Sequence, residues 1–388
     1  MTKAKTSGAV PASFHSEFDE APVTTAVEER VSVATQWQLM WWRFRKHRLA
    51  MISGIVIVAF YLVAIGADFL AYADPHKTEA FRSLIAPQPI HFFDEGRFSP
   101  HVFGLVGKRD PRTFKRVYEP DPEQKIPLRF FAEGYEYKFL GLFKTNRHLL
   151  GVDGGNAEEV IFLLGTDQLG RDLWSRMMVA CRLSLTIGLA GVTLSLVLGV
   201  LLGGVSGLYG GAIDTLIQRV IEILRSIPTI PLWMGLAAAM PRDWGVVQVY
   251  FAITVILSLI GWTDLARVVR GRFLALREED FVLAAELAGV GQMRVILRHM
   301  VPSFLSHIIA ATTLALPNMI ISETALSFLG LGIRAPAVSW GTLLKDAQNV
   351  RSVAVQPWML IPGLLVIITV LLFNFIGDGL RDAADPYK

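Results

Sequence analysis

Long apolar runs separated by polar stretches form the dominant pattern along this chain. Six runs are predicted to cross a membrane, at residues 49–72, 183–208, 228–240, 247–268, 305–329 and 359–375. A membrane-spanning helix needs about 20 mostly apolar residues to cross a hydrocarbon core of ~30 Å. The pattern therefore predicts an all-α polytopic membrane protein with six transmembrane helices.

The polar stretches divide the chain into regions. Residues 1–36 are polar and aperiodic and are predicted to form a cytoplasmic tail, whereas residues 37–73 hold an interfacial anchor and the first span. Residues 74–178 are predicted to form an extended extracytoplasmic insertion. Because aromatic, β-prone pieces alternate there with proline-rich ones, we expect a small domain with short strands. Residues 179–388 would form the core, with five transmembrane helices and a cytoplasmic loop at 277–303.

Composition agrees with a membrane protein and limits its chemistry. Mean hydropathy is +0.44, and 18% of the residues are charged, against about 25% in soluble globular proteins. The single cysteine, Cys181, excludes an internal disulfide and a cysteine metal cluster. The sequence has no GxxxxGK[ST] phosphate-binding loop, so we expect no ATP hydrolysis and no bound cofactor or metal in this chain.

The positive charges predict the orientation of the spans. Arginines and lysines are concentrated in 37–48 and in 267–298, whereas the short loops of the other side hold only Arg242, Arg334, Lys345 and Arg351. Because positive charge stays on the cytoplasmic side, both termini are predicted to be cytoplasmic. The basic, aromatic stretch 37–48 could also suggest nucleic-acid binding. Its position directly before a span favours membrane lipid as its partner and argues against nucleic acid.

Residues 277–303 are charged and lie between two apolar runs, so they are expected outside the lipid. A short helix is predicted at 280–288, with Asp280 as its N-cap and with Gly289 and Gly291 ending it. Its small side chains would let a soluble partner approach closely. An amphipathic helix resting on lipid headgroups is an equally good interpretation of these residues alone.

Two further candidate sites, Glu323 and the segment that begins at Gly165, each allow two interpretations. Glu323 lies well inside the fifth span, where it could line a transport pathway or form a packing hydrogen bond between helices, and packing is favoured. The segment 165–176 could be an outer gate or a dock for a binding protein. Equally, Asp167, Arg171 and Asp172 could form a capped, ion-paired entry to the helix before the second span. The candidate residues of this segment are Gly165, Thr166, Asp167, Gly170, Arg171 and Asp172.

The residues alone suggest two function classes, an intramembrane protease and an ion-coupled transporter. The string Gly204-Val205-Ser206-Gly207 and His307 in the fifth span would suit an intramembrane serine protease, but such short strings arise easily on small-residue packing faces. An ion-coupled transporter acting alone is disfavoured because the sequence shows no internal inverted repeats.

Several motifs together resemble one family. Ala284-Ala285 and Gly289, followed by Arg298-His299 and Pro302, resemble the cytoplasmic "EAA" loop of ATP-binding-cassette (ABC) importer permeases. LGTDQLGRDLWSR at 164–176, ETALSFLGLG at 323–332, Ser339-Trp340-Gly341 and NFIGDGLRDAADP at 374–386 are similar to the C-type subunit of the dipeptide and oligopeptide permeases.

This resemblance implies a type I ABC importer permease fold and a pore subunit of the bacterial cytoplasmic membrane. Its implied partners are a B-type permease, one or two ATP-binding subunits that hold ATP and Mg, and an extracytoplasmic substrate-binding protein. Transport would be by alternating access, and the implied cargo is short peptides, with oligosaccharides or another small solute as the alternative. The implied ATPase-coupling residues are Asp280, Phe281, Ala284, Ala285, Glu286, Ala288 and Gly289.

The chain also departs from the pattern of this family. Leu283 stands where the glutamate that names the loop is expected, and Ala180 stands where a glycine is expected. The polar region before Leu164 is longer than the resemblance implies.

Overall fold

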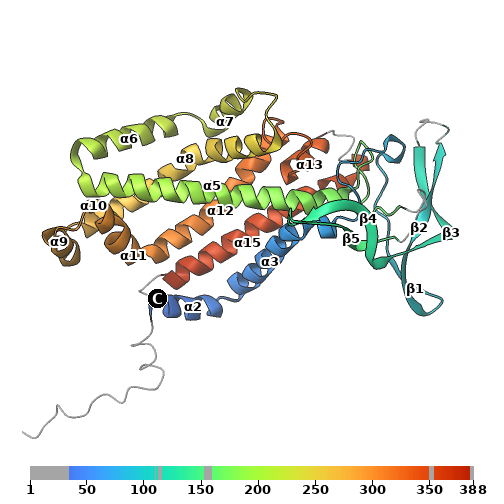
Figure 1. The fold of residues 1–388 in the computed structure, drawn as a ribbon, viewed down its shortest axis with the longest axis horizontal. Helices are drawn as coiled ribbons and strands as arrows, with labels where there is room; N and C mark the ends of the chain where they lie inside the picture. The colour runs from blue at the N-terminus through green and yellow to red at the C-terminus, as the bar shows by residue number, and fades with distance from the viewer. Residues whose placement is uncertain (1–34, 110, 112–115, 153–159, 349–353, 385–388) are drawn as a thin grey trace, which may run out of the picture.

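The computed structural model describes residues 35–109, 111, 116–152, 160–348 and 354–384. The predicted tail at 1–36 therefore lies almost wholly outside the described residues. A bundle of long helices carries β-strands at one end and the short helices α9 (Asp280–Leu287), α10 (Gln292–Arg294) and α11 (Val301–Ser303) at the other (Figure 1). We call these the strand end and the loop end of the bundle.

Among the described residues, five helical segments are long and apolar enough to span a membrane. They are α3 (Arg48–Ile65), α5 (Leu173–Tyr209), α8 (Val246–Leu276), α12 (Leu305–Phe328) and the segment Pro357–Ala384, which contains η3 (Pro357–Leu360) and α15 (Ile361–Ala384). The apolar runs thus located these spans correctly. However, α5 begins ten residues before the predicted run and α8 continues to Leu276, because both helices extend beyond their apolar parts.

The third predicted span is not a full-length helix. Helix α7 (Thr229–Ala238) has 10 residues, about 15 Å at the helical rise. It follows the amphipathic helix α6 (Gly211–Ser226) after a bend of 87°, and the two count as one span only if they form a broken one. Pro228 precedes α7 and has no N–H to continue a helix, which explains the break.

Helices α5 and α8 pack most closely, through the glycines that recur every four residues on α5. A Cβ atom on Gly203 would lie 2.5 Å from the carbonyl oxygen of Ala266, and one on Gly207 would lie 2.5 Å from Cβ of Phe273. Gly199 likewise faces Leu265. Small residues at this spacing allow two membrane helices to approach backbone to backbone.

At the loop end, α2 (Gln36–Lys46) packs against the last turns of α15. Met40, Phe44, Ala50 and Ala383 form a small buried cluster there. Helix α13 (Trp340–Asp346) lies at the opposite end and buries Trp340 completely.

The strand end consists of two antiparallel sheets. The first has the order β1 (His91–Asp94), β2 (Arg97–Arg109) and β3 (Arg116–Pro127), and the second pairs β4 (Arg129–Phe139) with β5 (Phe143–Gly151). The expectation of strands is confirmed, but three of them have 11 to 13 residues, so the expectation of short strands is wrong. The single turn η1 (Ala80–Arg82) precedes β1.

The glycine contact predicts a site-specific loss of stability. We expect Gly203→Ala to destabilise the bundle by about 1–3 kcal/mol, because the new methyl group meets α8 backbone that cannot move aside. The matched control is Gly54→Ala in α3, where nothing lies within 4 Å of the new Cβ. Thermal denaturation of the detergent-purified protein, followed by size-exclusion chromatography, measures both. Equal melting temperatures for the two variants would contradict the packing account.

Candidate functional sites

Helix α9 in the loop 277–303 is a single short helix with a defined end. It begins at Asp280, and the N-cap is Glu279, so the prediction that Asp280 caps the helix is wrong. Gly289 has φ of +74°, its N–H donates to the carbonyl of Glu286, and the N–H of Val290 donates to the carbonyl of Ala285. This is a Schellman ending, which favours glycine because of the left-handed backbone. The predicted stop at Gly289 is therefore confirmed.

One side chain fastens α9 to the bundle, and the others remain accessible. Val282 is fully buried and belongs to a cluster with Val269 and Phe273 of α8, Phe304, and three residues of the π-helical turn η2 (Val295–Met300). The predicted coupling residues Asp280, Phe281, Ala284, Glu286, Ala288 and Gly289 are exposed, and Ala285 is half-buried.

The exposed face of α9 is apolar as well as accessible. Leu287 is 89% exposed, and Phe281 and Leu283 are more than 40% exposed. An apolar surface on a short helix outside the spans is typical of an interaction site. Sequence reasoning missed Leu287, although its position one turn after Leu283 was a usable signal.

At the strand end, residues 165–172 form a tightly packed turn. Gly165 and Gly170 have φ of +77° and +74°, and a Cβ on Gly170 would lie 1.9 Å from the carbonyl oxygen of Glu79. Thr166 forms an isolated bridge with Asp172, and its hydroxyl donates to the carbonyl of Arg82. The turn is thus built against the residues that follow the first span.

The charged residues of this turn form a paired cluster. The buried Asp167 accepts hydrogen bonds from Arg171 at 2.7 Å and from Arg176. Asp346, at the end of α13, pairs with the same two arginines at 3.0 and 3.2 Å. Two acids and two arginines therefore tie the start of α5 to α13. Asp346 was not among the predicted site residues.

Asp172 caps α5. Its carboxylate accepts from the backbone N–H of Ser175 at 2.7 Å and from the hydroxyl of Tyr72 at 2.7 Å. Burial raises the pKa of the Asp172 carboxyl to about 6, against the opposing effect of hydrogen bonds from Ser175 and Tyr72. These contacts favour the interpretation of residues 165–172 as a capped, ion-paired turn.

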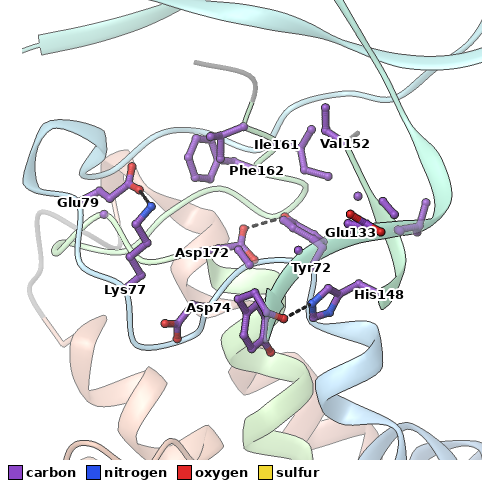
Figure 2. A pocket seen from close by; sticks show the side chains of 18 residues that line it. Tyr72, Asp74, Lys77, Glu79, Glu133, His148, Val152, Ile161, Phe162 and Asp172 are labelled. Carbon is purple, nitrogen blue, oxygen red and sulfur yellow. Dashed lines mark hydrogen bonds and ion pairs between the residues drawn. The ribbon is translucent and has the colours of Figure 1, made fainter. Parts of the chain in front are cut away.

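A cavity of about 330 Å³ adjoins this turn. Figure 2 shows Tyr72 directed at Asp172 on one side of the cavity and His148 on the other. Both ring nitrogens of His148 face carbonyl oxygens, those of Asp68 and Tyr135, each at 3.0 Å. The cavity therefore separates β4 and β5 from the turn, and no sequence motif indicated it.

Glu323 is fully buried on α12 and has protein partners. Its carboxylate accepts from the hydroxyl of Ser327 at 2.8 Å on the same helix and faces the hydroxyl of Ser184 on α5 at 3.4 Å. Ser184 also accepts from the backbone N–H of Trp340. These contacts across α5, α12 and α13 favour the packing role.

A second cavity, of about 410 Å³, lies inside the bundle between α5, α7, α8 and α12. Three polar atoms of its lining are buried and have no hydrogen-bond partner within the described chain: Oγ of Ser195, Nε1 of Trp233 and Oγ1 of Thr312. Sequence reasoning missed all three, although isolated polar residues within apolar runs could have indicated them. Glu323 does not line this cavity.

Ser206 of the GxSG string takes part in an ion-pair network. Its hydroxyl donates to Asp214, and it also accepts from Nε2 of Gln218 at 3.2 Å. Asp214 forms a two-point ion pair with Arg270 of α8. This hydroxyl thus joins α5, α6 and α8, and its described partners do not include His307.

Comparison with known proteins identifies the family. Residues 195–387 match the model of the binding-protein-dependent transport system inner membrane component. Residues 35–87 match the N-terminal transmembrane domain of oligopeptide transport permease C. Residues 88–194, which hold the strands and the turn at 165–172, lie between the two matched ranges.

Individual relatives agree with this match. The oligopeptide transport permease OppC of Bacillus subtilis is 38% identical over 62% of this chain and 76% of that protein. OppC of Haemophilus influenzae is 42% identical over 57% and 69% of the two chains. The dipeptide transport permease DppC of Alkalihalophilus pseudofirmus is 30% identical over 94% of both. An inward-facing structure of the MetNI methionine ABC transporter covers 54% of this chain and 97% of its own, at 18% identity and a TM-score of 0.42.

Members of this family are membrane components that hydrolyse no ATP themselves, and a separate ATPase does so. The enzyme alternative raised by the GxSG string is thereby overturned. The apolar spans and the loop 277–303 agree with the family that these matches indicate. This chain therefore belongs to the family of binding-protein-dependent transport permeases, as a multi-pass, non-catalytic permease subunit of an ABC transporter.

Proposed function

We propose that this chain is the C-type pore subunit of an ATP-driven peptide importer. It would receive peptides from a binding protein and pass them across the bacterial cytoplasmic membrane by alternating access. The accessible apolar face of α9, fastened to the bundle by Val282, carries this proposal. The names of the relatives, which transport oligopeptides and dipeptides, support peptides as the cargo.

The proposed orientation puts the loop end in the cytoplasm and the strand end outside. Both termini are then cytoplasmic, as the distribution of arginine and lysine favours. Helices α6 and α7 together act as one broken span, which gives six spans in total. Residues 74–178 form the extracytoplasmic region, and residues 179–388 form the core.

The proposed partners follow from this orientation. A B-type permease completes the pore, and one or two cytoplasmic ATP-binding subunits, which hold ATP and Mg, receive α9 through Phe281, Leu283, Leu287 and the small residues between them. A substrate-binding protein docks at the strand end. The ion pairs of the turn at 165–172 support a structural role for its charged residues. The binding protein would therefore contact the surface around this turn.

Motion of α9 would reach two spans at once. Val282 contacts a cluster that contains Phe273 near the end of α8 and Phe304 directly before α12. The rings of Phe273 and Phe304 meet edge to face at 5.8 Å. A push on α9 by an ATPase is therefore transmitted to α8 and α12, and rigid-body motion of packed helices of this kind is an established route to alternating access.

The cavity between α5, α7, α8 and α12 is the proposed peptide pathway in this subunit. Its lining combines apolar side chains with the unpartnered polar atoms of Ser195, Trp233 and Thr312. A buried polar group without a partner is costly, and the amide groups of a passing peptide can supply one. Oligosaccharides or another small solute remain the alternative cargo, since their hydroxyl groups can pair with the same atoms.

The first prediction concerns α9. We expect a cysteine introduced at Leu287 to form a crosslink to the ATP-binding subunit in the assembled transporter, because this side chain is exposed on the apolar face. The control is a cysteine at Leu169, which is 48% exposed at the strand end. Gel analysis after labelling the cysteine with a thiol-specific photocrosslinker and illumination measures both. The natural Cys181 is buried and contributes little background.

An ATP-binding subunit joined to residue 169, or to neither residue, would contradict the proposed orientation and docking. As a second readout, Leu287→Asp is expected to lower ATP-driven peptide uptake by roughly tenfold or more, as loss of an interface anchor does. Its melting temperature should stay near that of the unaltered chain, since residue 287 is outside the core.

The second prediction compares two neighbouring threonines of α12. Thr312→Val removes a hydroxyl that lines the cavity without a partner, and we expect uptake at low peptide concentration to fall about fivefold, the value of one hydrogen bond of ~1 kcal/mol. Thr313→Val is the control, because that hydroxyl donates to the carbonyl of Ile309 on its own helix. Initial uptake rates in proteoliposomes distinguish them. Equal rates for both variants would remove this cavity from the pathway.

A further inference from the structure

The hairpin formed by β4 and β5 ends in an apolar turn. Phe139 and Phe143 are the last paired residues, and the N–H of Leu142 donates to the carbonyl of Phe139 at 3.0 Å. Leu140 and Gly141 occupy the two central positions, with φ of +52° and +73°. Positive φ at both positions is typical of a type I′ turn. We call residues 139–143 the hairpin tip.

The turn itself does not account for leucine at residue 140. A type I′ turn favours asparagine or glycine at its first central position, because other side chains are strained at positive φ. Leu140 is nevertheless 53% exposed, Leu142 is 74% exposed and Phe143 is 68% exposed. Three large apolar side chains are thus exposed at the hairpin tip. One of them, Leu140, has a positive φ that is unfavourable for leucine.

A pair of lysines stands directly behind the hairpin tip. Lys138 and Lys144 are partners in the ladder, next to Phe139 and Phe143, and both are exposed. Neither has an ion-pair partner within the part of the chain that the structure describes. In a phospholipid surface, the apolar residues of the tip would contact the acyl chains, and the lysines behind them would contact the phosphates.

The position of the hairpin brings its tip to the end of a membrane span. Phe69 of the short helix α4 (Ala67–Leu70), directly after α3, lines one hollow with Phe139 and Phe143. Beside it, Arg182 of α5 pairs with Asp68 at 2.8 Å and also donates to the carbonyl of Ala64. An arginine and an aspartate at the end of a span mark the headgroup level. Figure 1 shows β4 and β5 beside the ends of the helices, whereas β1 to β3 extend farther away.

The apolar surface is continuous from the span to the hairpin. The outer face of α3 exposes Ile55, Val58, Leu62 and Ile65 along its length. Phe69 follows on α4, and the ring of Phe131 on β4 lies tilted against it, with ring centroids 6.0 Å apart. Where α3 crosses the membrane, this exposed face contacts lipid, and its extension through Phe69 leads toward the lipid at the hairpin tip.

We propose that the hairpin tip inserts into the phospholipid leaflet at the strand end, with Lys138 and Lys144 at the phosphates. The hairpin then acts as a second membrane attachment of the insertion between the first two spans. This inference needs only that α3 crosses the membrane, and it is independent of the cargo of the transporter.

The experiment places a fluorophore at the hairpin tip of the assembled transporter in vesicles. Bimane is attached to a cysteine at Leu142, and the vesicles contain phosphatidylcholine and phosphatidylglycerol with a spin label on the lipid near the headgroup. The control cysteine is at Phe98, which is 69% exposed on β2. We expect several-fold stronger quenching by the lipid label at residue 142 than at residue 98, and the reverse order with aqueous iodide.

Two outcomes would overturn the proposal. Iodide quenching that is equal at both residues would mean that the hairpin tip is in water. Protection from both quenchers would mean that a protein partner, such as the second permease or the binding protein, covers it. A Lys138→Gln/Lys144→Gln variant adds a further test, since its lipid quenching at residue 142 should lose its dependence on phosphatidylglycerol while its fold, judged by melting temperature, stays unchanged. Quenching that keeps its full dependence on anionic lipid would refute the role of the lysines.

Discussion

The backbone contact between α5 and α8 is the interaction on which the other parts of this structure depend. Within a membrane, burial of apolar surface gives helices little reason to associate, and close packing of small residues replaces it. Gly203 and Gly207 allow that packing because any side chain there would collide with α8. Helix α5 has 37 residues and is about 55 Å long. It therefore joins the turn at 165–172 to the network of Ser206, Asp214 and Arg270 at the other end.

Several polar groups inside the bundle are paired with one another, and the few that lack a partner stand out against them. Glu323 is held by Ser184 and Ser327, and Asp214 is held by Arg270 and Ser206. A lipid environment requires such pairing, because water is absent. Ser195, Trp233 and Thr312 depart from it, and all three line one cavity. Buried polar atoms of Tyr135, Arg176, Thr324 and Trp340 also lack a partner among the described residues. Only the first three groups, those of Ser195, Trp233 and Thr312, line the cavity between α5, α7, α8 and α12.

Local patterns predicted the parts of this fold that depend on neighbours in sequence. Apolar runs predicted the five long spans, and Gly289 predicted the end of α9. Contacts between distant residues were beyond such patterns. Arg171 and Asp346 are 175 positions apart, and no local signal connects them. The apolar run at 228–240 located α7, but this helix has 10 residues and counts as a span only together with α6.

The attachment of α9 explains how a helix of 8 residues can move much longer ones. Within α9, Val282 is the buried residue and Ala285 packs against the same cluster, so one face of the helix is fixed to the bundle. Its C-terminal end is rigid, because the Schellman ending binds Val290 to Ala285. The π-helical turn η2 follows and contributes Val295, Ile296 and Met300 to the same cluster, and π-turns inside helices are frequent at functional sites. This cluster therefore connects α9 with α8, η2 and the start of α12 at the loop end of the bundle.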